Sequence, residues 1–150
     1  MAWSGYGKLG EHFHRLIQGN LNLSHMFSAP VIYDTLKFPA VDWQRDVVNN
    51  PNIDAVYIAS PDFLHTPQAI DCLQAGKHVL LEKPVYNFDS VMAAAVKANK
   101  ILQMNLHRRY DPQFHQWRQF MQAQSKPVHK ILFETFDPNV PENDTTNIEE

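Results

Sequence analysis

Apolar residues follow two patterns that alternate along the chain. Short runs that are apolar on both faces predict buried strands at 29–34, 53–60, 78–82, 101–106 and 129–136. Apolar residues spaced for one face of a helix predict helices at 9–18, 66–76 and 89–98, another from Asp111 onward and a brief one within 41–51. Continuous apolar strands separated by single helices are typical of an α/β fold, with a parallel sheet covered on both faces.

Capping residues predict where several helices begin and end. Thr66 is expected to cap the helix at 66–76, and Gly76 to close it in the left-handed conformation. Asp42 is expected to cap the brief helix, and the last helix to start at Asp111 with a proline at its first position.

The two ends of the chain depart from this pattern. Only "MAWS" precedes Gly5, whereas a central strand usually has five or six residues, so the first strand is expected to be incomplete. The stretch 137–150 has five acidic residues and no Lys or Arg, with little to bury, and we expect a largely unpacked tail.

Length, charge and composition narrow the classes of function. A chain of 150 residues suits one domain, and 13 Lys and Arg against 16 Asp and Glu leave no basic surface for nucleic acid. Cys72 is the single cysteine, so no intrachain disulfide can form. No targeting pattern or membrane-length apolar run is present. These features predict a cytoplasmic protein without a nucleic-acid or membrane partner.

Polar or turn-forming residues come directly after each expected strand. The carboxyl ends of parallel strands share one edge of the sheet, and ligands bind outside that edge in open α/β folds. We therefore expect a ligand site made by residues from distant parts of the chain: Gly5–Gly10, Asp34, Ser60-Pro61, Glu82-Lys83-Pro84 and His107-Arg108-Arg109.

The first of these clusters has the pattern G-x-G-x-x-G. Gly5 permits a tight turn, Gly7 lets a pyrophosphate approach the backbone, and Gly10 lets helix pack on strand. The backbone from Gly5 to Gly10, with Lys8 and Leu9, would then hold the phosphates at the positive end of a helix. The alternative is a glycine-rich turn without a ligand.

Asp34 lies 24 residues after Gly10, near the spacing expected for an acid that accepts from the adenosine ribose. A carboxylate there repels a 2′-phosphate and favours NAD, although Lys37 nearby leaves room for NADP. The alternative is an Asp that only forms a turn.

Lys83 is the predicted catalytic residue, because an ammonium at a sheet edge can hold a substrate hydroxyl and help move its proton. Glu82 is expected to orient Lys83, and the alternative is an ordinary surface ion pair. The eight histidines show no spacing suited to a metal, so no metal site is expected.

Three segments together resemble the Gfo/Idh/MocA family of NAD(P)-dependent oxidoreductases, from Gly5 to about Pro138: "GYGKLG", "DAVYIASPDFLHTPQAIDCLQAGKHVLLEKPV" and "NLHRRYDPQF". The resemblance implies a Rossmann-type doubly wound sheet, with Lys83 at the substrate and nicotinamide. It also implies a cis bond between Lys83 and Pro84, and a coenzyme lined by Ser60, Pro61, His65, Glu82, Pro84 and Arg109.

The same resemblance implies oxidation of a CH-OH group of a polyol or sugar, and possible contacts between subunits of the full-length form. This chain departs from the family pattern in three further ways. Only seven residues separate Asp34 from Asp42, which leaves no room for the usual helix, and His107 stands where many members have Asn. The chain also ends at Glu150, before the family's second, α+β domain.

We therefore expect an NAD(P)-binding Rossmann domain at 1–127, followed at 128–150 by the start of a truncated second domain. The chain alone is expected to have little activity. The alternative is a non-catalytic fragment that binds nucleotide or pairs with subunits, or an incomplete gene model.

Overall fold

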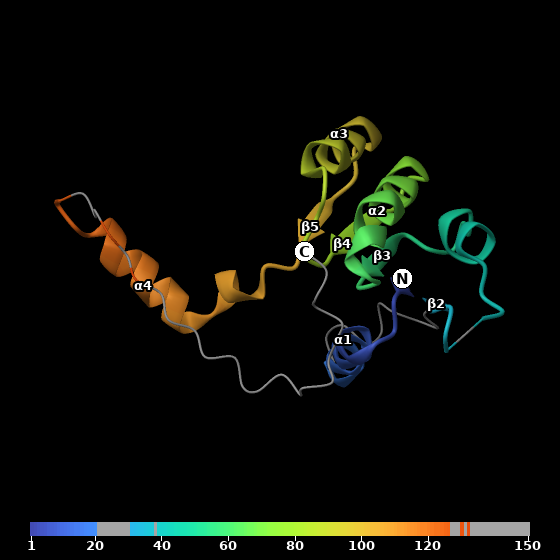
Figure 1. Cartoon of the computed structure of the whole chain (residues 1–150), viewed down its shortest axis with the longest axis horizontal. Helices are drawn as coiled ribbons and strands as arrows, with labels where there is room; N and C mark the ends of the chain where they lie inside the picture. Colours follow the sequence, from blue (N-terminus) through green and yellow to red (C-terminus); the bar gives the residue numbers. More distant parts are fainter. Residues whose placement is uncertain (21–30, 38, 127–129, 131, 133–150) are drawn as a thin grey trace. The chain divides into compact units, whose positions relative to one another are not determined.

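A computed structural model of the chain describes residues 1–20, 31–37, 39–126, 130 and 132. The chain divides into two compact units, Met1–Tyr110 and Asp111–Glu150. The first unit contains a sheet of five parallel strands in the order β2-β1-β3-β4-β5 (Figure 1). These strands are β1 (Ala2–Ser4), β2 (Val31–Tyr33), β3 (Ala55–Ile58), β4 (His78–Leu81) and β5 (Leu102–Met104).

Helices connect the strands of the first unit. Its α-helices are α1 (Lys8–Gly19), α2 (His65–Gln74) and α3 (Phe88–Ala98). Three shorter elements are the π-helical turn η2 (Trp43–Val48) and the 3-10 turns η3 (Asp62–Leu64) and η4 (His107–Tyr110). The described part of the second unit holds α4 (Pro112–Gln122). No helix among the described residues is long and apolar enough to cross a membrane.

The alternation of side chains along β3 shows how both faces of the sheet are covered. Val56 and Ile58 point to one face, where they pack in a core with residues of α2 and α3. Tyr57 points to the other face, where it packs with Trp3 of β1 and Ile17 of α1. Figure 1 accordingly shows α1 on the opposite side of the strands from α2 and α3. The predicted doubly wound parallel sheet is therefore confirmed.

The first strand is short, as expected, because β1 has only three residues, all of them buried. It nevertheless lies inside the sheet, paired with β2 on one side and β3 on the other. The seven residues between Asp34 and Asp42 were expected to be too few for the usual helix. No helix occurs at the described residues among them, 35–37 and 39–41.

Three of the four predicted helix signals are confirmed. Asp42 accepts a hydrogen bond from the Arg45 N–H, although the helix it begins is a π-helical turn. Asp111 caps α4, and Gly76 is left-handed with φ of +79°. Thr66 is the exception.

The prediction that Thr66 caps α2 is wrong. The turn η3 leads directly into α2, which therefore begins at His65, and the Thr66 hydroxyl instead donates to the carbonyl of Tyr86. The strand predicted at 129–136, the tail at 137–150 and the domain boundary at 127/128 lie outside the described residues, except for Lys130 and Leu132.

A buried lysine joins the loop before β3 to the start of β4. Lys77 is 4% exposed, and its ammonium donates to the carbonyls of Asn50 and Ile53, each at 2.8 Å. Burial lowers the pKa of Lys77, with Asp54 and Cys72 acting in the opposite direction. The bond to the Ile53 carbonyl is buried, and the Asn50 carbonyl also accepts from the Ile53 N–H at 3.3 Å. Lys77 therefore ties this loop to the start of β4.

We expect Lys77→Met to lower the free energy of unfolding by about 1–3 kcal/mol, because it keeps the apolar stem but removes the ammonium that donates to the buried Ile53 carbonyl and to the Asn50 carbonyl. Urea denaturation would measure the change. Lys97→Met, at an exposed position of α3, is the matched control and should change little. Equal midpoints for both variants would contradict the assigned role of Lys77.

Candidate functional site

The residues just after the strands lie along one edge of the sheet. The ladder of backbone hydrogen bonds continues one residue beyond the strands, which keeps these residues in register: Gly5 N–H to Tyr33 O (2.9 Å), Ala59 N–H to Ser4 O (2.7 Å), Glu82 N–H to Ile58 O (3.0 Å) and Asn105 N–H to Leu81 O (2.8 Å). The ends of all five strands therefore meet at the carboxyl edge, as the sequence predicted.

The three glycines after β1 have different surroundings. Gly5 has φ of +81°, and a Cβ there would lie 2.4 Å from the carbonyl oxygen of Ala59. A Cβ on Gly10 would lie 2.3 Å from the carbonyl oxygen of Gly5. A Cβ on Gly7, in contrast, would meet nothing within 4 Å. Gly5 and Gly10 are thus required by the fold, whereas Gly7 keeps open the space in front of α1.

The start of α1 has the properties of an anion site. Gly7 is the N-cap residue, and no side chain caps the helix. The N–H groups of the first turn, which include those of Lys8 and Leu9, have no intrahelical acceptors. Uncapped N–H groups and the helix dipole together favour a bound phosphate. The open space at Gly7 and this helix end therefore fit the pyrophosphate of a dinucleotide.

Asp34 follows β2 and holds the glycine loop. Its Oδ2 accepts from the Tyr6 N–H (2.8 Å), and its Oδ1 accepts from the N–H groups of Leu36 and Lys37 (3.0 Å each). Burial raises the pKa of Asp34, but these three bonds and the charge of Lys37 outweigh burial, so the pKa is lowered overall. The turn-forming alternative therefore describes part of what Asp34 does.

Ser60 and His65 join the turn after β3 to neighbouring segments. The Ser60 hydroxyl donates to Gln68 Oε1 at 2.7 Å, and the hydroxyl of Ser4 donates to the same oxygen at 2.7 Å. His65 is 2% exposed, and its Nδ1 and Nε2 lie 2.7 and 2.8 Å from the carbonyl oxygens of Pro84 and Ser60. His65 therefore links the turns that follow β3 and β4, and its contact with a coenzyme stays a prediction.

Glu82 does not orient Lys83, and that expectation is wrong. Glu82 is 4% exposed, and its Oε1 accepts from the Tyr57 hydroxyl at 2.6 Å and from the Asn105 side-chain amide. Burial, followed by this bond to Glu82, raises the pKa of Tyr57. Because side chains alternate between the faces of a sheet, Glu82 lies on the same face as Tyr57, its hydrogen-bond partner.

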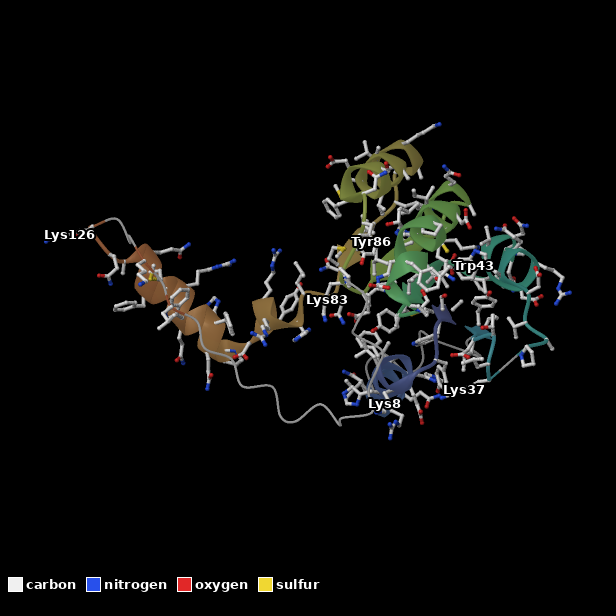
Figure 2. The ribbon with its side chains drawn as sticks, viewed as in Figure 1. Lys8, Lys37, Trp43, Lys83, Tyr86 and Lys126 are labelled. Atoms are coloured by element: carbon white, nitrogen blue, oxygen red, sulfur yellow. The ribbon has the colours of Figure 1, made fainter. Side chains whose placement is uncertain are left out.

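Lys83, labelled in Figure 2, follows β4 and is exposed to solvent. Its side chain is exposed and makes no hydrogen bond or ion pair with the residues that the structure describes. The surface ion pair considered as an alternative is therefore not formed with any of them. The bond between Lys83 and Pro84 is cis, as the family resemblance implied.

The remaining predicted residues lie in exposed turns or at the helix start. Pro61 precedes η3, Arg109 lies in η4 after β5, and Lys8 and Leu9 begin α1. No group of three His, Cys, Asp or Glu that could hold a metal occurs among the described residues.

Three residues that hold the carboxyl edge together were missed in the sequence: Gln68, Tyr57 and Asn105. Asn105 lay inside the strand predicted at 101–106, and its place directly after a strand became visible only because β5 ends at Met104. Gln68 leaves a trace, since it interrupts the apolar face of α2 beside Ala69. Tyr57 shows no such signal, because its partner Glu82 is 25 residues away.

A family model described as "Oxidoreductase family, NAD-binding Rossmann fold" matches residues 4–106. This range covers β2 to β5, the last residue of β1, the glycine loop and Lys83. The chain belongs to this family, Gfo/Idh/MocA.

Curated relatives in the family include dehydrogenases of inositols. The chain is 38% identical over 73 residues to inositol 2-dehydrogenase of Rubrobacter xylanophilus, an alignment that covers 45% of this chain and 21% of the relative. It is 29% identical over 120 residues to scyllo-inositol 2-dehydrogenase (NADP(+)) IolW of Bacillus subtilis, covering 73% and 34%.

Solved structures support the same fold. An NAD-binding protein from Listeria innocua superposes with a TM-score of 0.63 at 25% identity, covering 83% of this chain and 40% of that chain. The chain of 150 residues therefore spans two fifths or less of the length of these three relatives.

We expect Tyr57→Phe to lower the free energy of unfolding by about 1–3 kcal/mol, because buried Glu82 loses a hydrogen-bond donor. Glu82→Gln in the same background should recover part of this loss, since a neutral amide is less costly to bury than a carboxylate. Tyr110→Phe, at an exposed tyrosine, is the control in urea denaturation. No difference between the two Tyr→Phe variants would contradict this reading of the network.

Proposed function

We propose that this chain is the coenzyme-binding and lysine-bearing part of an NAD(P)-dependent dehydrogenase that oxidises a secondary alcohol of a polyol or sugar. The observation that carries the proposal is the open space at Gly7 in front of an uncapped helix. That space lies where the chain turns from β1 into α1. There β1 lies between β2 and β3, so that the strand order reverses, and this reversal is where dinucleotides bind in doubly wound folds.

Each predicted site residue has a place in this proposal. The backbone from Gly5 to Gly10, including Lys8 and Leu9, holds the pyrophosphate, and Asp34 accepts from the adenosine ribose. Lys83 is the catalytic residue at the nicotinamide end. The sides of the coenzyme cleft are assigned to Ser60, Pro61, His65, Glu82, Pro84 and Arg109.

The sheet spacing suits a ligand of dinucleotide length. Asp34 follows β2 and Lys83 follows β4, with β1 and β3 between them. Three inter-strand steps of about 4.8 Å separate the two residues by about 14 Å along the edge. One extended ligand can therefore contact Asp34 at one end and reach Lys83 at the other.

The coenzyme, when bound, supplies the acceptor for a hydride from the carbinol carbon. The role of the chain is to position both reactants and to move the hydroxyl proton. Lys83 can contact the substrate hydroxyl because its side chain is exposed and unpaired among the described residues. The substrate class is inferred from the inositol dehydrogenases among the relatives.

A second candidate function is coenzyme binding or subunit pairing without catalysis. It is favoured by the small part of each relative's length that the chain covers. A chain spanning 21–40% of three relatives could bind coenzyme without catalysis, or pair with full-length subunits. Binding is common to both candidates, and turnover separates them. We favour the dehydrogenase part because the chain retains Lys83 at the sheet edge.

We expect Gly7→Ser to weaken NADH binding about tenfold or more without lowering the melting temperature. The serine side chain fits the open space and can cap α1, so it competes with the pyrophosphate for the same N–H groups. NADH fluorescence titration and thermal unfolding of the purified chain measure the two effects.

Gly5→Ala is the contrasting variant, because its Cβ would collide with Ala59 and its φ is positive. It should lower the melting temperature and weaken binding together. Undiminished NADH binding by Gly7→Ser would contradict the placement of the pyrophosphate. Failure of the unaltered chain to bind NADH at millimolar concentration would overturn the proposed function.

We expect the 150-residue chain to oxidise myo-inositol slowly or not at all, because positioning of both reactants supplies much of the rate enhancement. Lys83→Ala should abolish any residual turnover while leaving the NADH dissociation constant within about twofold. Reduction of NAD at 340 nm measures turnover, with Lys97→Ala as control. Turnover that survives Lys83→Ala would contradict the catalytic role of this lysine.

A further inference from the structure

We propose that Glu11 is a specificity-determining residue, which favours NAD over NADP by holding the ammonium group of Lys37. The inference rests on the proposed function, because it concerns the ribose end of the same coenzyme site. The residues involved come from the glycine loop, from α1 and from the turn after β2, where Figure 2 labels Lys37.

Tyr6 links these three segments. Its N–H donates to Asp34 Oδ2 at 2.8 Å, which ties the glycine loop to the end of β2. Its hydroxyl lies 2.7 Å from Nδ1 of His14, which ties the loop to α1. The ammonium of Lys37 lies 5.3 Å from the centre of the Tyr6 ring, within the range of a cation–π contact.

Lys37 is held between two carboxylates. Its backbone N–H donates to Asp34 Oδ1 at 3.0 Å, and its Nζ lies 3.8 Å from Glu11 Oε2. Glu11 lies in the first turn of α1, whereas Asp34 follows β2. The Lys37 ammonium thus has an exposed ion pair with Glu11 and a contact with the Tyr6 ring, and its charge acts on Asp34, the residue that would accept from the ribose. The side chains of Glu11, Asp34 and Lys37 together carry a net charge of −1.

The two coenzymes make different demands on this cluster. A ribose 2′-hydroxyl needs only an acceptor, which Asp34 supplies without any change in the cluster. A 2′-phosphate carries a charge of about −1.5 to −2 and needs a cation, as phosphates generally do. Lys37 could serve it only by giving up its ion pair with Glu11. Glu11 therefore disfavours the phosphorylated coenzyme.

Glu11→Gln tests the inference without changing the side-chain shape. We expect the ratio of the NADPH to the NADH dissociation constant to fall about two- to fivefold, the range of an exposed ion pair. The ratio cancels any effect on the pyrophosphate, which both coenzymes share. Fluorescence titrations of the full 150-residue chain give both constants, and the change should shrink at high salt.

Two further variants make the test specific. Lys37→Ala should raise the ratio, and Glu11→Gln should have no effect in the Lys37→Ala background, because Glu11 acts through Lys37. Asp89→Asn, in the first turn of α3, makes the same change in net charge and should leave the ratio unaltered.

The outcomes separate the inference from the proposed function. An unchanged ratio in Glu11→Gln, or an equal change in Asp89→Asn, overturns the role of Glu11 while leaving coenzyme binding intact. An effect of Glu11→Gln that persists without Lys37 also overturns it. Absence of binding of either coenzyme by the unaltered chain overturns the proposed function and this inference with it.

Discussion

The structure depends on a close approach of two backbone segments at the centre of the sheet. Gly5 passes so near the carbonyl of Ala59 that a Cβ would lie 2.4 Å from its oxygen, and Gly10 approaches Gly5 equally closely. This contact lets α1 begin immediately after a strand of three residues. The uncapped start of α1 is therefore separated by only three residues from β1, the strand that pairs with both β2 and β3. The anion site is thus a result of how tightly the chain turns.

Buried polar side chains keep the surrounding turns in place. Gln68 joins the ends of β1 and β3, His65 joins the turns after β3 and β4, and Glu82 joins β3, β4 and the residue after β5. Each group is buried and has partners, which makes such a network rigid and costly to disrupt. Lys83 is exposed and directly follows Glu82 of this network. The residue proposed to contact the substrate is therefore attached to a rigid part of the fold.

Local signals in the sequence predicted the fold well. Strands and helices followed from apolar spacing, and Gly76, Asp42 and Asp111 marked helix ends through conformational or capping preferences that act within a few residues. The strand-end rule placed Asp34 and Lys83 at one edge, because parallel strands leave no other arrangement. Thr66 was misjudged since η3 already starts the helix before it.

Long-range partners could not be predicted in the same way. Glu82 and Lys83 are neighbours in sequence, which suggested that one orients the other. Glu82 instead bonds with Tyr57 and Asn105, which lie 25 and 23 residues away. The Glu11–Lys37 pair was equally hidden, because α1 and the turn after β2 meet only when β1 and β2 pair.

Amide chemical shifts of the ¹⁵N-labelled chain during NADH addition test the central claim most directly. The account predicts that the largest changes fall on the carboxyl edge: Gly5–Gly10, Asp34–Lys37, Ser60 and Lys83. Changes confined to the opposite edge, around Asp54 and Lys77, would contradict it.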